Sequence, residues 1–413
     1  MKTSRDDFLV GIDREELEQR LRDYFDTKVT HEEIRARYPS VMAKTGGFDP
    51  VETRQALRKR GMLRDHIVRY AYRPFDIRWV YWEPETKLLD RNRDEYWPHV
   101  APTNVFLSAG ERNRKEVFYQ PQIVRAIADH HLVESNVALL PLELNGGNGA
   151  WRPNLPQPLL DYLAVNKLRP SDVFNHIVAI LHAPAYHREN AGALRMDWPR
   201  VPLPSDPTIV ASSSELGAML TALLDSETPA SGVSVALRPG LKAMGLPTKR
   251  GGKPLDSDDL ALRVRWGATQ NAGGGRRIVM PGPGRTHERA YTEAERTALA
   301  EDGKPFGLGV DAVLALLGET TLDVHLNENA WWSNVPARVW DYMLGGYPVI
   351  KKWLSYREHE VLGRALKPDE VAYVSEMVRR VAAILLMGRF LDDNYAASKA
   401  VAMEWPPASI HGV

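Results

Sequence analysis

Histidine pairs and a glycine-containing string are the first candidates for a metal site or a phosphate-binding loop, and their spacing decides whether they could form one. His130 and His131 are adjacent, which would point the two rings to opposite sides of a strand. His182 and His187 are five residues apart, rather than the four that place two ligands on one helical face. The string FGLG at 306–309 has the wrong spacing for a dinucleotide-binding loop, and an ordinary turn is the simpler interpretation. These patterns predict neither a metal site nor a nucleotide loop.

Other catalytic signatures are missing from the sequence. It contains no Gly-x-x-x-x-Gly-Lys-Ser/Thr string and no Gly-x-Ser-x-Gly string, so a phosphate-binding loop and a serine hydrolase of that type have no support. The absence of cysteine excludes disulfides, thiolate metal sites and cysteine nucleophiles. A nuclease-type carboxylate cluster stays open, because its members can lie far apart in a sequence.

The charges balance overall but are segregated locally. The 413 residues carry 53 Lys and Arg against 53 Asp and Glu, so a nucleic-acid binder would have to gather its basic residues on one face. Between residues 240 and 290, ten Lys and Arg stand against four Asp and Glu. No run of eighteen apolar residues and no leader-like start are present. We therefore expect a cytoplasmic protein that does not contact a membrane.

Periodic patterns predict the elements that must position any site. Helical spacing of apolar residues covers 12–25, 50–63, 172–189, 335–344 and 368–387. Asp49 is expected to cap the second of these helices, with Pro50 in its first position. Aromatic and β-branched residues predict strands over 67–82, and short apolar runs, including one at 117–119, predict further strands over 104–142.

These elements predict a mixed α/β chain of the α+β type with four parts. The parts are a helical connector over 1–66, a β-rich subdomain over 67–204 that includes the helix at 172–189, an irregular, basic, Gly/Pro-rich insertion over 205–330, and a helical C-terminal subdomain over 331–413. Many glycines and prolines interrupt the third part, which is why it is expected to be irregular.

Three sets of strings are specific enough to point to a family. They are AYRPFDIRWVY (71–81) with LDRNR (89–93), ILHAPAY (180–186) with DWPRVPLP (197–204), and NVPARVWDYMLGGYPVIKKWLSYR (334–357). Together, and in this order, they resemble the C-terminal target-recognition (specificity) domain of type ISP restriction–modification enzymes and of related adenine-N6 DNA methyltransferases. The resemblance covers about 1–204 and 325–395.

The resemblance implies a function in DNA reading. Such enzymes join a nuclease and an ATP-driven motor to an adenine methyltransferase and then to the DNA-reading domain, and this chain resembles only the last part. The Asn/Asp-Pro-Pro-Tyr/Phe tetrapeptide of the methyltransferase is absent, so no catalytic residue is expected in this chain. No cofactor is expected in it either, and S-adenosylmethionine and ATP would belong to the parent enzyme. Its partners would be duplex DNA and an adenine methyltransferase domain or subunit, with the β-rich part as the DNA-recognition subdomain.

On this hypothesis Lys and Arg supply phosphate contacts, while a few Arg, Asn or Gln side chains read base edges. The candidates lie near the first set of strings, in the glycine-rich stretch, or after Gly345-Gly346: Arg78, Arg91, Arg93, Arg276, Arg277, Lys351, Lys352 and Arg357. Arg91 and Arg93 are preferred to Arg73, because Tyr-Arg-Pro-Phe is typical of a packed turn. Lys351 and Lys352 could instead serve a helix C-terminus, and Arg276 and Arg277 could lie in a solvated loop.

Two other classes of function stay open at this point. One is a protein-interaction module of a restriction–modification complex that does not read DNA itself, which zero net charge mildly favours. The other is an enzyme whose site is formed only in the fold, from a concave pocket with convergent titratable groups.

Overall fold

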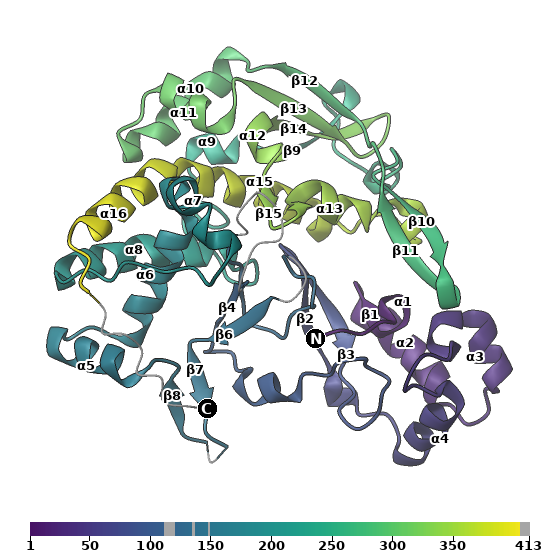
Figure 1. Cartoon of the computed structure of the whole chain (residues 1–413). Helices are drawn as coiled ribbons and strands as arrows, with labels where there is room; N and C mark the ends of the chain where they lie inside the picture. The colour runs from purple at the N-terminus through teal and green to yellow at the C-terminus, as the bar shows by residue number, and fades with distance from the viewer. Residues whose placement is uncertain (111–119, 134–136, 148, 405–413) are drawn as a thin grey trace.

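The computed structural model describes residues 1–110, 120–133, 137–147 and 149–404. Within these ranges the chain is a mixture of helices and several small antiparallel sheets, which confirms the α+β class. The strand expected at 117–119 and the last residues of the C-terminal part, 405–413, lie outside the described residues. Figure 1 shows the elements arranged as an arc, with the N-terminal helices at one end and α5 at the other.

Helices α2, α4 and α15 match the helices predicted over 12–25, 50–63 and 368–387, and α6 with α7 covers the one predicted over 172–189. The longer ones are α2 (Arg14–Phe25), α3 (His31–Arg37), α4 (Pro50–Arg60), α5 (Gln157–Asn166), α6 (Pro170–His182), α7 (Pro184–Asn190), α8 (Pro207–Leu224), α10 (Glu293–Gly303), α11 (Val310–Leu317), α13 (Val349–Ser355), α15 (Pro368–Leu386) and α16 (Gly388–Ala400). The shorter ones are α1 (Asp6–Leu9), α9 (Pro239–Lys242), α12 (Ala337–Trp340) and α14 (His359–Leu362). Asp49 caps α4 as predicted, since its carboxylate accepts hydrogen bonds from the amides of Val51 and Glu52.

The helix predicted over 335–344 is wrong at its start. Strand β14 (Ala330–Pro336) continues through Val335 and Pro336, where it pairs with Leu322 and Thr321, so only Ala337–Trp340 is left to form α12. The residues of this pattern come from three elements, since Val335 lies in β14, Val339 and Trp340 lie in α12, and Met343 and Leu344 form β15.

The strands form small antiparallel sheets. The strands are β1 (Val10–Gly11), β2 (Ile67–Arg73), β3 (Asp76–Tyr81), β4 (Phe106–Ala109), β5 (Ile123–Val124), β6 (Ala138–Pro141), β7 (Glu143–Asn145), β8 (Trp151–Pro153), β9 (Leu246–Lys249), β10 (Gly267–Ala272), β11 (Arg276–Pro281), β12 (Thr286–Ala290), β13 (Thr320–His325), β14, β15 (Met343–Leu344) and β16 (Tyr347–Pro348). Two sheets have three strands, in the orders β1-β3-β2 and β5-β4-β6, and one has four, in the order β12-β13-β14-β9. The remaining pairs, β7-β8, β10-β11 and β15-β16, are hairpins.

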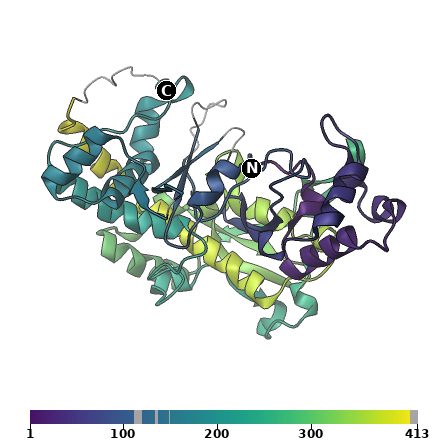
Figure 2. The ribbon, with the colours of Figure 1, turned by 90° about the horizontal axis from the view of Figure 1, so that it is seen from below.

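Three apolar clusters hold these elements together. The largest joins α6, α8, α11, α13 and α15 to the four-stranded sheet. A second cluster lies under the N-terminal helices and the β2–β3 hairpin, and a third lies beside the β5-β4-β6 sheet. The first cluster contains residues from both the middle and the C-terminal end of the chain, so the C-terminal helices brace the rest of the fold (Figure 2).

The part predicted as an irregular insertion, 205–330, is regular instead. It contains α8 to α11 and β9 to β13, and several of these elements enter the largest core cluster. Helix α8 is long and apolar enough to cross a membrane by length and composition alone, with a mean hydropathy of 1.2. It packs against α6 so closely that a Cβ on Gly217 would lie 1.9 Å from the carbonyl oxygen of Asn175, which identifies α8 as a core helix.

Candidate nucleic-acid interface

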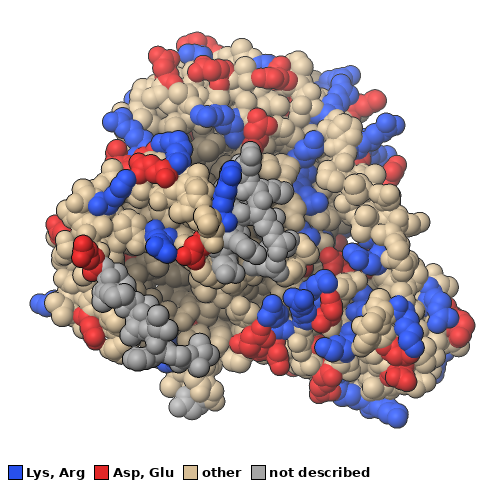
Figure 3. Space-filling view, in the orientation of Figure 1, with Lys and Arg blue, Asp and Glu red and all other residues tan. Residues whose placement is uncertain are grey.

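A groove of about 670 Å³ lies between the β10–β11 hairpin and the N-terminal part of the chain. Its basic lining residues come from three separate regions of the sequence: Lys2, Arg20, Arg37, Arg73, Arg78, Arg276 and Arg277. Its acidic lining residues are Asp6, Asp7, Glu16 and Asp129. Figure 3 shows Lys and Arg interspersed with Asp and Glu both over the N-terminal part and along the upper edge of the molecule.

The root of the hairpin is fixed by packing. The indole of Trp266 is fully buried, lies against Trp340, and donates from Nε1 to the carbonyl oxygen of His325 at 2.9 Å. The Glu358 carboxylate accepts from the amides of Arg265 and Trp266 at 3.1 and 2.8 Å. These contacts hold both the position and the direction of the hairpin where it leaves the core.

A glycine is required where the hairpin returns to the core. Gly284 has a φ of +63°, and a Cβ there would lie 2.0 Å from the Trp266 ring. The backbone must therefore pass directly over the indole, which only glycine permits.

The tip of the hairpin rests on the N-terminal part. The amide of Arg277 donates to Asp7 Oδ2 at 3.3 Å, and Val279 packs against the N-terminal apolar cluster. The turn at 273–275 lies over the segment Pro39–Met42, where a Cβ on Gly275 would come 2.8 Å from Pro39 Cβ. The hairpin (Figure 1) therefore spans from the four-stranded sheet to the N-terminal helices and forms one wall of the groove.

The floor of the groove combines tyrosines with cations. The Arg78 guanidinium lies 3.9 Å from the centre of the Tyr72 ring and 4.2 Å from that of Tyr356, and Lys352 Nζ lies 4.7 Å from the centre of Tyr356. Burial opposes ionisation of Tyr356, but the charges of Arg73, Lys352 and Arg78 outweigh it and lower the pKa of this phenol. The floor thus places Arg78 and Lys352 against the faces of tyrosine rings.

Arg73 is fixed by contacts within the fold, as expected if Tyr-Arg-Pro-Phe forms a packed turn. Its Nη1 contacts Asp129 Oδ1 at 2.7 Å, and Asp129 Oδ2 accepts from Tyr70 Oη at 2.6 Å. Burial raises the pKa of Asp129, but bonding to His131 and the charge of Arg73 outweigh it, so the net shift is downward. Arg73 lines the groove but its charge is already matched.

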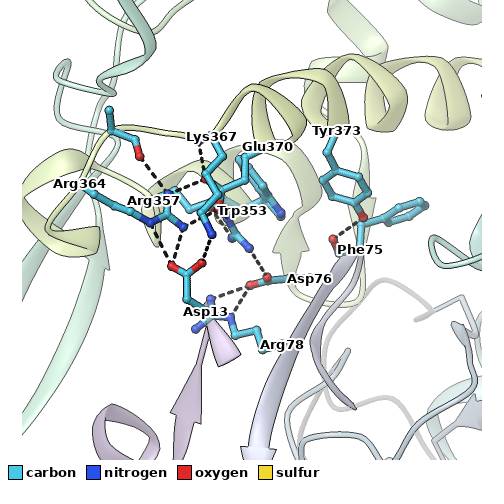
Figure 4. A network of polar contacts seen from close by, with 11 residues as sticks. Asp13, Phe75, Asp76, Arg78, Trp353, Arg357, Arg364, Lys367, Glu370 and Tyr373 are labelled. Atoms are coloured by element: carbon cyan, nitrogen blue, oxygen red, sulfur yellow. Dashed lines mark hydrogen bonds and ion pairs between the residues drawn. The ribbon is translucent and has the colours of Figure 1, made fainter. Parts of the chain in front are cut away.

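Arg78 and Arg357 are not free to contact DNA, which corrects two of the predicted contact residues. Both guanidinium groups bind the buried carboxylate of Asp76, Arg78 Nη2 at 2.6 Å from Oδ2 and Arg357 Nη2 at 2.9 Å from Oδ1 (Figure 4). Their side chains are 9% and 5% exposed. Burial opposes ionisation of Asp76, but the charges of Arg357 and Arg78 outweigh it and hold the pKa of the carboxyl well below its usual range.

A second ion cluster ties the start of α2 to the start of α15. Arg364 bridges Asp13 Oδ2 at 2.7 Å and Glu370 Oε2 at 2.6 Å, and Lys367 also contacts Asp13 (Figure 4). The Tyr373 hydroxyl donates to the carbonyl oxygen of Phe75 at 2.7 Å. We call these two clusters together the interlock: Asp13, Asp76, Arg78, Arg357, Arg364, Lys367, Glu370 and Tyr373. It joins the N-terminal helices and the β2–β3 hairpin to the C-terminal helices.

The other predicted cations differ in exposure, and only Arg276 and Arg277 among them line the groove. Arg276 and Arg277 are exposed at the hairpin tip, and Arg91 is exposed where its backbone pairs with Lys2. Lys351 and Lys352 are half-buried on α13. In the described ranges, the side chains of Arg91, Arg276, Arg277 and Lys351 have no ion-pair partner within 4.0 Å. Arg93 differs, because it pairs with Glu95 Oε1 at 2.9 Å.

Sequence reasoning missed several residues of this region. Tyr72, Tyr347 and Tyr356 lie within two of the quoted strings, but nothing in their spacing indicates that they meet across a groove. Gln270 and Asn271 are exposed on β10. Their amides next to the Arg276-Arg277 pair were the one available signal, since these residue types read base edges.

Two features outside the groove bear on chemistry, the candidate metal ligands and a buried histidine. Among the described residues, no group of three or more His, Asp or Glu could hold a metal ion. His182 lines a separate cavity of about 740 Å³ with Tyr342, and burial lowers the pKa of this histidine to about 3. Its Nε2 lies 2.9 Å from the carbonyl oxygen of Pro121, as expected of a neutral imidazole within the core.

Comparison with known proteins adds a family and a fold. Residues 1–376 match the family model described as the Type ISP C-terminal specificity domain. Comparison with curated protein sequences gave no match. Three solved structures align with a TM-score of 0.55 and 16% identity each: the cryo-EM structure of the DrdV–DNA complex, a nuclease-deletion mutant of the Type ISP restriction–modification enzyme LlaGI in complex with a DNA substrate mimic, and the ATP-dependent Type ISP restriction–modification enzyme LlaBIII bound to DNA.

These alignments cover most of this chain but a minor part of the other three. They include 99%, 95% and 95% of this chain, and 35%, 32% and 22% of those chains, in the same order. At this level of identity the similarity shows a shared fold.

Proposed function

Because the chain belongs to the family of Type ISP C-terminal specificity domains, we propose that it recognises a specific sequence in duplex DNA. In this proposal it is the specificity part of an adenine-N6 DNA methyltransferase or restriction–modification enzyme. Methyl transfer, S-adenosylmethionine and ATP belong to the other parts of that enzyme, to which this chain is joined or bound.

One observation carries the proposal. The lining of the groove holds seven Lys and Arg against four Asp and Glu, although the whole chain has no net charge, and two of these cations, Arg276 and Arg277, have no ion-pair partner in the described part of the chain. Arg276 and Arg277 line one side of it, and Lys352 lies over Tyr356 of its floor. Duplex DNA carries a dense row of phosphates, and neutralising them releases counterions, so such cations bind it strongly at low salt.

The buried, paired arginines and the exposed arginines have different roles, and this difference supports the same proposal. Burying an arginine beside a carboxylate stabilises a fold but leaves no charge for a ligand. Arg78 and Arg357 are used in that way, and Arg78 also lies against two tyrosine rings of the floor. The cations at the hairpin tip contribute no comparable contact to the fold, and a DNA backbone is the partner that fits their charge and exposure.

The test is selection of sequences from a pool of random duplexes by the purified chain at low and moderate salt. We expect one short motif to be enriched and retention to fall steeply as salt rises. R276A/R277A should lower retention, whereas R195A/R389A, which removes two exposed arginines outside the groove, should not. Retention without a motif would contradict sequence-specific reading, and no retention at low salt would contradict DNA binding altogether.

A further inference from the structure

The β10–β11 hairpin carries exposed polar and basic side chains that packing within the fold does not explain. Its strands run from Gly267 to Ala272 and from Arg276 to Pro281, and most of their side chains are exposed. A two-stranded ribbon is only marginally stable unless one of its faces packs on something. Here the root packs through Trp266 and the middle through Val279, while the residues near the tip are polar and open to solvent.

The register of the hairpin places two base-reading residue types side by side. Asn271 pairs directly with Arg277, so their side chains leave the same face with Cβ atoms about 5 Å apart. On the opposite face Gln270 pairs with Ile278 and Arg276 pairs with Ala272, so an amide and a guanidinium are not direct partners there. Only one face of the hairpin therefore presents an adjacent Asn and Arg.

Building on the proposed function, we infer that the β10–β11 hairpin is the segment that reads bases, with Asn271 and Arg277 as specificity-determining residues. The major groove admits a two-stranded ribbon, and this one extends roughly 20 Å for six residues per strand. Arg binds the O6 and N7 edge of guanine through two hydrogen bonds, and Asn binds the N6 and N7 edge of adenine in the same way. Their spacing matches neighbouring base pairs, so the motif contains a guanine next to, or one step from, an adenine.

The face of the hairpin that carries Asn271 and Arg277 is anchored to the N-terminal part. Val279 lies two residues from Arg277 on β11 and packs against the N-terminal cluster. The amide of Arg277 itself donates to Asp7. Two contacts to the N-terminal part therefore fix the backbone at the reading pair, which lowers the entropy that the backbone loses on binding, while the two side chains stay exposed.

The hairpin supplies its own matched control. Q270A/R276A removes an amide and a guanidinium from the opposite face, and N271A/R277A removes the same two groups from the reading face. None of the four side chains is buried, so both double variants should fold, which circular dichroism and the midpoint of thermal unfolding would verify.

The experiment repeats the duplex selection with these two variants. N271A/R277A should lose preference at one or two motif positions by roughly ten-fold or more, whereas Q270A/R276A should bind more weakly with the same motif. R277K keeps the charge but not the two-pronged geometry, so it should retain most of the affinity and lose the guanine preference.

The outcomes separate this inference from the proposed function. If the wild-type chain enriches no motif, the proposed function fails. If it enriches a motif that N271A/R277A enriches unchanged, DNA recognition stands and the assignment of the reading residues is wrong. A motif altered only by Q270A/R276A would also overturn the assignment.

Discussion

The interlock and the hairpin tip use the same residue type in opposite ways. In the interlock, Arg78 and Arg357 share the carboxylate of Asp76 in a buried site that joins β3 to the C-terminal helices. At the hairpin tip, Arg276 and Arg277 are exposed, and their side chains have no carboxylate within ion-pair distance in the part of the chain that the structure describes. Arginines in this protein therefore have two roles: an internal carboxylate binds Arg78 and Arg357 within the fold, whereas Arg276 and Arg277 keep their charge available beside the groove.

Removing the Asp76 carboxylate, which Arg78 and Arg357 share, should have the largest effect on the stability of the fold. D76A leaves two buried guanidinium groups without their common partner, and we expect a loss of about 3–5 kcal/mol in the free energy of unfolding. Urea denaturation would measure it. R276A/R277A serves as the control and should change the same quantity by less than about 0.5 kcal/mol, because exposed substitutions seldom matter more. A D76A chain as stable as the wild type would show that the interlock does not hold the fold.

The pH dependence of stability should show how much the ionised carboxylate of Asp76 contributes to the fold. The pKa of Asp76 is lower in the folded chain than the usual value of about 3.9, so its ionised form stabilises the fold above that pH. This contribution is lost as the pH falls below about 4, and D76N lacks it at every pH. The stability difference between wild type and D76N should therefore be constant above about pH 5 and narrow below pH 4, by up to about 1.4 kcal/mol per pH unit. A difference that stays constant to pH 3 in urea titrations would contradict the ion pairing.

Lys351 and Lys352 lie between the two regions, because they occupy α13 close to both the groove and the interlock. If they act as ligands for phosphate, K351A/K352A should lower duplex affinity by roughly ten-fold and leave the unfolding free energy nearly unchanged. A role at the C-terminal end of α13 predicts the reverse, a stability loss of about 0.3–1 kcal/mol with affinity unaffected. Fluorescence anisotropy and urea denaturation of one preparation would distinguish the two.

Removing the uncharged hydrogen bond of the interlock, from Tyr373 to Phe75, should change the stability of the fold less than removing its carboxylate. Y373F removes the hydroxyl that donates to the carbonyl oxygen of Phe75 and should cost about 1 kcal/mol of stability. Duplex affinity should not change, because Tyr373 does not line the groove. Reduced affinity in this variant at unchanged stability would show that the two regions are not independent.

The sequence predicted the elements that depend on local spacing. The helices α2, α4 and α15 follow apolar periodicity and local caps, and the β2–β3 hairpin follows its aromatic and β-branched residues. The hairpin β10–β11 was missed because its strands, GATQNA and RRIVMP, show little alternation and depend on the distant packing of Trp266 against Trp340.

The candidate site was predictable in its residue types but not in their roles. Arg78 and Arg357 looked equivalent to Arg276 and Arg277 as isolated arginines in a sequence. Arg357 is withdrawn from the surface by Asp76, which lies 281 residues away along the chain. Such a pairing has no local signature, so only the fold could separate the arginines that stabilise from those that are exposed.

The most direct test of this account is the salt dependence of duplex affinity for the wild type, R276A/R277A and R195A/R389A. The logarithm of the affinity falls with the logarithm of the salt concentration, by about 0.9 for each phosphate that the protein neutralises. We predict that R276A/R277A lowers this slope by about one, because Arg276 contacts a phosphate and Arg277 a base edge, and that R195A/R389A leaves it unchanged. Equal slopes for all three chains would contradict the claim that the exposed arginines of the hairpin tip contact DNA.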